Sequence, residues 1–289
     1  PIVGPISGIA AFWAAWMWYI TSLYIFGQKH TLLEVRMPSD VSKSPRAMEQ
    51  VLIQLQVGSG ETTFIDKYWK GGSRPFFSLE LASFGGDVRF FIWTRAGLRN
   101  LVEAAMYSQY PEVEIVEAED YASAFQYNPA IHDSFVTGYK YSNSDAFPIR
   151  TYIDFELDSD PKEEFKVDPI APLIEWMGSV KKGEQIWFQI ICRALDGKFD
   201  TWKLEAQKAL NKIYYGLDLT NDELKEKIKE AKVELAKARK TDQKARGNVP
   251  EAKKDSDLPY ADKQKVEAIY NNISKPGFEV MIRVAYIAD

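Results

Sequence analysis

Apolar residues dominate the start of the chain, where no charged side chain occurs between Ile2 and Phe26. As an α-helix, the part from Ile6 to Phe26 would rise about 31 Å, which matches a bilayer hydrocarbon core of roughly 30 Å. The pattern therefore predicts a transmembrane anchor over residues 1–28. A cleaved signal peptide is one alternative, but no basic segment precedes the apolar run. A buried core helix is another, but such helices are seldom apolar on all faces.

Small residues recur along one side of this predicted helix. Gly4, Gly8, Ala11 and Ala15 are spaced by four, three and four positions, which places them on one helix face. Such a stripe lets two membrane helices approach closely. It predicts a transmembrane packing stripe for self-association. The alternative is that Gly and Ala are simply frequent in membrane helices.

Basic residues follow the apolar run and none precedes it, as shown by Lys29, Arg36, Lys43 and Arg46. Because basic residues that flank a membrane helix stay in the cytoplasm, the N-terminus is expected outside and the body inside. The prediction is a single-pass protein of the cell membrane. Cysteine usage agrees, since Cys192 is the one cysteine and cannot form an intramolecular disulfide.

Beyond the anchor, the hydrophobic period alternates between two residues and 3.6 residues, which predicts strands and helices in turn. Residues 31–120 give the order βαββαβ, with Gly85-Gly86-Asp87 as a hairpin turn. This order is that of a ferredoxin-like unit. The expected strands are Leu32–Met37, Phe76–Phe84, Val88–Trp93 and a short one around Val113, and the expected helices run from about Ser44 to Val57 and from Arg95 to Tyr110.

Residues 121–146 are rich in Tyr, Ser, Asn and Pro and are interpreted as a connector. A second ferredoxin-like unit is predicted over residues 147–289, with a charged helical insertion at about 199–254. The predicted fold class is therefore α+β, with a transmembrane helix and two βαββαβ-type units. Because the last expected strand reaches the end of the sequence, we expect the front part of a longer protein. The expected strands here are Ile149–Leu157, Glu184–Leu195 and Phe278–Ala288, with helices near 168–177, 200–214, 220–246 and 259–274.

One expected helix, Asn221–Arg246, carries a narrow apolar seam on a charged surface. Its seam residues are spaced by four, three and four positions, as in a coiled coil. A contact with a protein partner is one interpretation, and a basic edge that touches anionic lipid or nucleic acid is another. A third is a helix that lies on its own domain or in solvent. The candidate partner seam consists of Leu224, Ile228, Ala231 and Leu235.

Charge narrows the classes of partner. The formal net charge is −5, from 36 basic and 41 acidic residues. Residues 221–254 hold 11 basic against 7 acidic residues, which leaves 25 against 34 in the remainder. An acidic body argues against broad binding of nucleic acid. Membrane lipid and a protein partner are the expected partners.

Residues that carry chemistry are sparse. No GxxxxGK[ST] phosphate loop and no GxGxxG motif are present, and Gly58-Ser59-Gly60 is interpreted as a flexible loop. His30 and His132, the two histidines, are far apart in sequence and predict no metal site. They are interpreted as an interfacial residue and a solvated loop residue. Cys192 lies in an apolar run and is expected to be buried.

The densest carboxylate cluster is Glu112, Glu114, Glu117, Glu119 and Asp120. A general acid–base pair is one interpretation. Alternation with Val113 and Ile115 favours the other, which is a strand that turns its glutamates to solvent. No catalytic, cofactor-binding or metal-binding residue is therefore predicted, no cofactor is implied, and enzyme activity is not expected.

Several segments together resemble a family of membrane-anchored proteins of candidate-phylum and related bacteria. They are LLEVRMPSD, SLELASFGGDVRFFIWTRAGLRNLVEAAMYSQYPEVEIVEAEDY, PIRTYIDFE, VDPIAPLIEWMGSVKKGEQIWFQI and GFEVMIRVAYIA. The family is associated with type IV secretion or conjugation-like ATPases, and these segments resemble the front region that precedes the ATPase. The resemblance implies no catalytic residue, because no nucleotide-binding motif is present.

Two functions are carried forward from the sequence. The first is a non-enzymatic, membrane-anchored assembly or adaptor component that faces the cytoplasm, with a type IV secretion-like ATPase as its expected partner. The alternative is an accessory or regulatory domain of a DNA-translocating ATPase system that contacts nucleic acid.

Overall fold

The computed structural model describes residues 3–38, 43–57, 63–157, 168–195, 201–216, 223 and 258–289. The chain divides into two compact units. Unit 1 consists of Pro1–Lys140, Tyr152–Asp196 and Phe278–Asp289, and unit 2 consists of Tyr141–Thr151 and Gly197–Gly277. These boundaries follow packing and so differ from the segments expected from the sequence.

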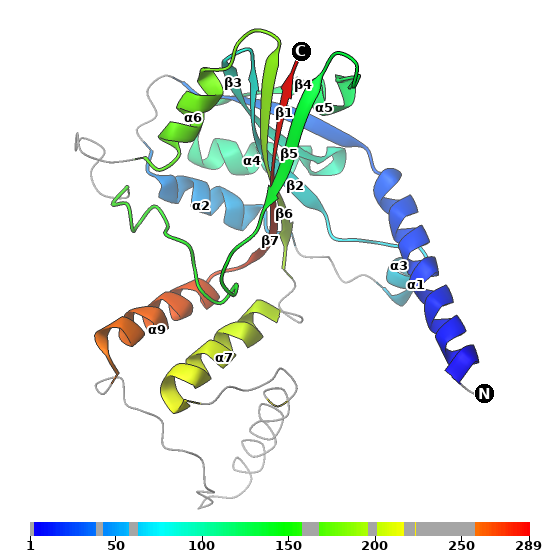
Figure 1. Cartoon of the computed structure of the whole chain (residues 1–289), viewed down its shortest axis with the longest axis vertical. Helices are drawn as coiled ribbons and strands as arrows, with labels where there is room; N and C mark the ends of the chain where they lie inside the picture. The colour runs from blue at the N-terminus through cyan, green and yellow to red at the C-terminus, as the bar shows by residue number, and fades with distance from the viewer. Residues whose placement is uncertain are drawn as a thin grey trace, which may run out of the picture. The chain divides into compact units, whose positions relative to one another are not determined.

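The N-terminal helix α1 spans Val3–Phe26 (Figure 1). Its stretch Ser7–Phe26 is long and apolar enough to cross a membrane, and 6% of that stretch is buried within the protein. The expected apolar helix is therefore present. A helix that is apolar on all sides and so little covered by its own chain is suited to a lipid environment.

A seven-stranded sheet forms unit 1, in the order β4-β1-β3-β2-β6-β7-β5 (Figure 1). Every pair of neighbouring strands is antiparallel. The strands are β1 (His30–Arg36), β2 (Phe76–Phe84), β3 (Asp87–Arg95), β4 (Glu114–Ala118), β5 (Asp133–Tyr139), β6 (Glu184–Ala194) and β7 (Phe278–Ala288).

Three helices cover one face of this sheet. Helix α2 (Pro45–Gln54) begins at Ser44, whose side chain accepts a hydrogen bond from the Arg46 backbone N–H at 3.2 Å, and Pro45 occupies the first helical position. Helix α4 (Arg99–Gln109) follows a short 3₁₀ turn. Helix α6 (Ala171–Gly178) begins after Asp168, whose carboxylate accepts from the Ile170 N–H.

The main core lies between α2, α4 and the sheet. Leu33 of β1, Ile92 of β3 and Met106 of α4 are almost completely buried in this cluster. Full burial of each such side chain contributes about 1.5–3 kcal/mol. A second cluster joins Met177 of α6 to Ile186 of β6. Both clusters lie on the same face because side chains two residues apart in a strand share a face.

The hairpin between β2 and β3 has the predicted turn. Gly85 and Gly86 both adopt positive φ angles, of 61° and 93°, which is the backbone of the twisted two-residue turns that glycine favours. The tip of the hairpin lies against the end of α6 and the residues after it. A Cβ atom built on Gly86 would lie 2.9 Å from the carbonyl oxygen of Gly178 and 3.0 Å from that of Val180.

Two sequence expectations for the middle of the chain are wrong. The segment interpreted as a connector contains the edge strand β5 and the short helix α5 (Tyr121–Ala124). The expected strand Ile149–Leu157 instead consists largely of turns, and Glu156 adopts a positive φ of 56°. The edge of the sheet beside β7 is occupied by β5.

The later strands do not form a sheet of their own. Along its whole length β2 pairs with β6, with Phe76–Phe84 opposite Gln185–Arg193. The strands expected in a second unit therefore extend the sheet of the first.

In unit 2, α7 (Thr201–Tyr215) and α9 (Tyr260–Ile273) occupy the two expected helical positions, and they pack around Leu210 and Ile269. The expected helix Asn221–Arg246 lies outside the described residues, apart from Glu223. The same holds for all four residues of the candidate partner seam.

We expect Gly86→Ala to destabilise the protein. A non-glycine residue at positive φ costs about 1–3 kcal/mol, and the new Cβ would also collide with two backbone carbonyl groups. Gly97→Ala is the matched control, because nothing lies within 4 Å of its Cβ position. Denaturant unfolding of the detergent-solubilised chain should show the loss for Gly86→Ala alone. Equal stability of the two variants would contradict the turn geometry.

Candidate functional site

The sheet face opposite α2, α4 and α6 carries a row of polar and aromatic side chains. In register, Glu34 of β1 lies opposite Phe91 of β3, and Phe91 lies opposite Glu80 of β2. Glu80 in turn lies opposite Gln189 of β6, and Gln189 lies opposite Arg283 of β7. Directly opposed residues share a face of a sheet, so these five side chains form one row across it.

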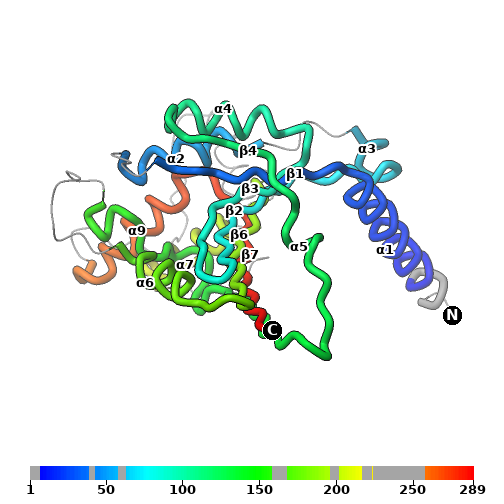
Figure 2. The backbone as a smooth tube through the Cα atoms, turned by 90° about the horizontal axis from the view of Figure 1, so that it is seen from above, coloured from blue at the N-terminus to red at the C-terminus, as the bar shows by residue number. Residues whose placement is uncertain are grey.

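Helix α5 lies on this face (Figure 2). The side chain of Asp120 caps the helix and accepts hydrogen bonds from the backbone N–H groups of Ala122 at 3.0 Å and Ser123 at 3.3 Å. This cap fixes the next residue, Tyr121, over the sheet. The Tyr121 ring packs on Phe84, Phe91 and Trp187, with ring centroids 5.1–5.5 Å apart.

Hydrogen bonds link Tyr121 to the row. Its hydroxyl donates to Glu80 Oε2 at 2.5 Å and accepts from Gln189 Nε2 at 2.9 Å. Gln189 Oε1 accepts from Arg283 Nε at 2.5 Å. Burial and the nearby charge of Glu80 raise the pKa of Tyr121 far above its usual value, so the hydroxyl remains a donor at neutral pH. Glu80 and Gln189 are buried, and each has a hydrogen-bond partner in this network.

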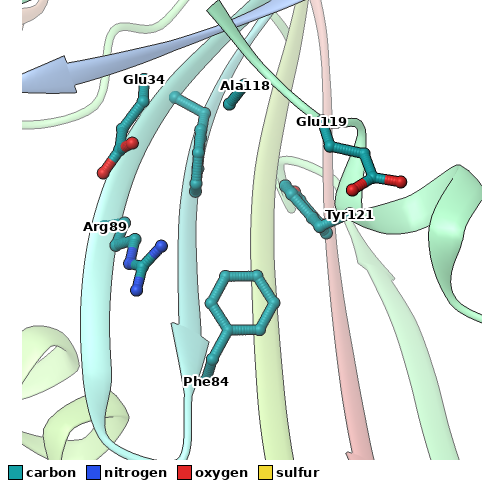
Figure 3. A pocket seen from close by; sticks show the side chains of 7 residues that line it. Glu34, Phe84, Arg89, Ala118, Glu119 and Tyr121 are labelled. Atoms are coloured by element: carbon teal, nitrogen blue, oxygen red, sulfur yellow. The ribbon is translucent and has the colours of Figure 1, made fainter. Parts of the chain in front are cut away.

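A cavity of about 310 Å³ opens beside Tyr121 (Figure 3). Its lining includes three aromatic side chains and two carboxylates. Figure 3 shows Glu34 and Arg89 on one side of the cavity and Glu119 and Tyr121 on the other. The cavity is lined by Glu34, Phe84, Arg89, Phe91, Ala118, Glu119 and Tyr121.

The cavity lining carries two carboxylates and one guanidinium, and Glu34 and Arg89 are each already in an ion pair. The guanidinium of Arg89 is bound to Asp87, with Nε at 2.8 Å and Nη2 at 2.6 Å from the same carboxylate oxygen. It also lies 6.0 Å from the centre of the Phe84 ring. Glu34 is paired with Arg36 at 3.1 Å. Carboxylates beside aromatic faces suit a cationic group, which gains both charge pairing and cation–π contact.

Several carboxylates that the sequence predicts to face solvent have defined partners or positions in the structure. Glu117 forms an ion pair with Arg99 and accepts a hydrogen bond from Thr31, and Glu114 lies 3.5 Å from Arg36. Asp120 caps α5, as described above. Glu119 lines the cavity.

The other singled-out residues also have defined surroundings. Cys192 is buried in the main core, as predicted, and burial raises the pKa of its thiol to about 11. His132 is not a solvated loop residue, because its side chain is only 11% exposed and its ring packs near Phe125. Its Nδ1 accepts from the Asn128 N–H at 2.9 Å. Within the described parts of the chain, no group of three or more His, Cys, Asp or Glu residues could hold a metal ion.

Among the residues whose side chains are described, the predicted packing stripe is not covered by the rest of the chain. Gly8, Ala11 and Ala15 are exposed, and a Cβ built on Gly8 meets nothing within 4 Å. Self-association through this stripe therefore stays a prediction, and the surface of Gly8, Ala11 and Ala15 is accessible to a second helix.

Sequence reasoning did not find the cavity. Glu34, Phe84 and Glu119 come from segments that are far apart in the chain, and only the strand register brings them together. No local motif marks such a site. Comparison of the chain with protein-family models, with curated proteins and with solved structures gives no match.

His30 gives the stability of this face a pH dependence. Its ring stacks on Trp93, with centroids 4.2 Å apart, and burial and then the charge of Arg95 lower its pKa. The unfolded chain binds a proton on this histidine below about pH 6.5, whereas the folded protein takes it up only at lower pH. His30 therefore contributes no pH dependence well above pH 6.5, and stability is lost as the pH falls through that value.

We expect His30→Phe to flatten the dependence of the melting temperature on pH between about 7.5 and 5.5, relative to the unaltered chain. Phenylalanine keeps the stacking on Trp93 and removes the titration. The measurement is a series of thermal melts of both proteins in matched buffers. If the melting temperatures of the two proteins change in parallel with pH throughout this range, the folded protein does not hold His30 neutral, and the prediction is wrong.

Proposed function

We propose that this protein is a non-enzymatic, membrane-anchored assembly or adaptor component that faces the cytoplasm. The observation that carries the proposal is the exposure of α1. Phe12, Trp18 and Phe26 and other large apolar side chains of this helix are exposed. An exposed apolar surface of this length marks a membrane or partner contact, and the length matches a bilayer.

Charge supports the proposed orientation. Lys29 and Arg36 lie just after α1, whereas α1 itself holds no Lys or Arg. The distribution of basic residues supports a body on the cytoplasmic side.

The strand order supports a ferredoxin-like arrangement for the first half of the sheet. Strands β4-β1-β3-β2, with α2 and α4 on one face, have the order and helix placement of a ferredoxin-like unit. We propose this arrangement for the first half of the sheet. For the second half the described elements offer no separate four-stranded unit, because β6 and β7 continue the same sheet.

The cavity on the open sheet face supports binding of a partner. A basic side chain of another protein would meet the carboxylates of Glu34 and Glu119 and the ring of Phe91. Nucleic acid is the less favoured ligand, because these carboxylates repel phosphate. We propose a type IV secretion-like ATPase as the partner on the basis of the resemblance described above. A salt-dependent shift of DNA by the full chain would instead favour the DNA-translocation alternative.

Membrane insertion and orientation can be tested together in bacterial cells that express the full chain. The protein should stay in the membrane pellet after carbonate extraction, and protease added to intact cells should leave the body uncut until the cells are lysed. Cleavage of the body without lysis would contradict the proposed orientation. Release of the protein by carbonate would contradict the proposed membrane anchor.

Phe12→Arg/Tyr19→Arg is the variant that should lose insertion, because each charge at a helix centre costs about 2.5–3.5 kcal/mol. Both side chains are exposed on α1, and the Tyr19 ring packs near Trp16 of the same helix, with centroids 6.5 Å apart. The matched control is Phe12→Leu/Tyr19→Leu, which should remain in the pellet.

Partner binding at the cavity can be tested by a photo-crosslinking amino acid placed at Phe84 of the full chain in cells. We expect one discrete protein adduct, and we expect Glu34→Gln/Glu119→Gln to remove most of it. Glu112→Gln/Glu175→Gln is the charge-matched control, since both glutamates are exposed and neither lines the cavity. An adduct of unchanged yield in the double variant would show that the cavity carboxylates do not recognise the partner.

A further inference from the structure

A short helix, α3 (Phe64–Tyr68), packs against α1 within unit 1 (Figure 1). The indole Nε1 of Trp16 donates a hydrogen bond to the carbonyl oxygen of Tyr68 at 3.0 Å. The rings of Trp13 and Tyr68 lie 5.7 Å apart, and those of Trp16 and Trp69 lie 5.8 Å apart in an edge-on arrangement.

The turn after α3 approaches α1 even more closely. Gly71 has a φ of +67°, and a Cβ atom at this position would lie 2.2 Å from the carbonyl oxygen of Ile20. Glycine is therefore required for this backbone contact. Together with the ring contacts, it docks the α3 segment along successive turns of α1, from Trp13 to Ile20.

The outward side of the α3 segment is apolar and uncovered. Phe64 is 67% exposed, Ile65 is 58% exposed and Trp69 is 63% exposed. The neighbouring part of α1 is equally open, with Phe12 69% exposed. Two helices that touch one another thus present large apolar side chains outward, and no described residue covers them.

The position of the contact along α1 identifies what covers this surface. Ile20 precedes Phe26 by six residues and Trp13 precedes it by thirteen, which corresponds to about 9 Å and 20 Å along the helix axis. A bilayer that surrounds α1 as far as Phe26 therefore reaches the level at which α3 is docked. We propose that α3 is a second membrane-contacting element, in which Phe64, Ile65 and Trp69 contact lipid beside α1.

The polar groups of the α3 segment are compatible with this environment. Thr63 accepts a hydrogen bond from the Asp66 N–H at 3.2 Å, which satisfies a backbone group at the helix start. Asp66 pairs with Lys70 at 2.8 Å, so its carboxylate has a partner of opposite charge. Lys67 is exposed, and its ammonium group lies 5.3 Å from the centre of the Tyr68 ring, which gives it a cation–π contact.

This inference rests on the proposed membrane anchor, and the experiment separates the two. A fluorophore that reports polarity (NBD) is attached to single cysteines in a Cys192→Ala background of the full chain. The sites are Leu23 in α1, Ile65 in α3 and Val136 in β5, all of which are exposed. The protein is reconstituted in phosphatidylcholine–phosphatidylglycerol vesicles, with or without lipids that carry a quencher on the acyl chain.

We expect emission to shift to the blue and to be quenched by the labelled lipid at Leu23 and at Ile65, with neither effect at Val136. Quenching at Leu23 without quenching at Ile65 would overturn the α3 inference and leave the anchor standing. Absence of quenching at both sites would overturn the anchor and the inference with it. A blue shift at Ile65 without lipid quenching would show that protein covers α3, which also overturns the inference.

A second comparison tests the named side chains. With the fluorophore at Ile65, Phe64→Ser/Trp69→Ser should lose most of the lipid quenching, and the same double variant should leave the Leu23 signal unchanged. Lys67→Ser is the matched control on the same helix and should keep the quenching. If the double variant is quenched as strongly as the unaltered chain, Phe64 and Trp69 do not hold α3 at the membrane.

Discussion

The antiparallel pairing of β2 with β6 is the interaction on which the rest of unit 1 depends. It joins strands that lie about a hundred residues apart in the chain, and it makes one sheet of what would otherwise be two. On the helix-covered face, it places the strands that α6 packs on, and the Ser83 hydroxyl donates to the Met177 carbonyl oxygen at 2.6 Å there. On the open face, it sets Glu80 beside Gln189 and so completes the polar row.

Because the side-chain period of a strand is two residues, the register of this pairing is strongly specified. A slip of one residue would move either Glu80 or Gln189 to the helix-covered face, among Leu33, Ile92 and the other core residues. A buried carboxylate without partners there would be costly. The Tyr121–Glu80–Gln189–Arg283 network thus selects one alignment of the strands, a role that buried polar groups have in other folds as well.

Local signals in the sequence predicted much of the fold. The Gly85-Gly86 turn, the Ser44-Pro45 helix start and the long apolar strands near 184–195 and 278–288 are each encoded by neighbouring residues, and all are present. Strand β5 was missed because an exposed edge strand needs no apolar alternation, and most of its residues face solvent. The β2–β6 pairing and the cavity depend on contacts between distant segments, for which a single sequence carries no local pattern.

The joint between α1 and the sheet is short and braced. Three residues separate the end of α1 at Phe26 from the start of β1 at His30. The Ala96 N–H donates to the Lys29 carbonyl oxygen at 2.8 Å, and the Arg95 guanidinium lies 5.4 Å from the centre of the Tyr24 ring. These two contacts resist rotation at the joint, so α1 and the sheet move together as one rigid body. A bilayer that changes thickness changes the tilt of a helix that spans it. Lipid composition would in that way set the angle at which the open sheet face meets whatever approaches it.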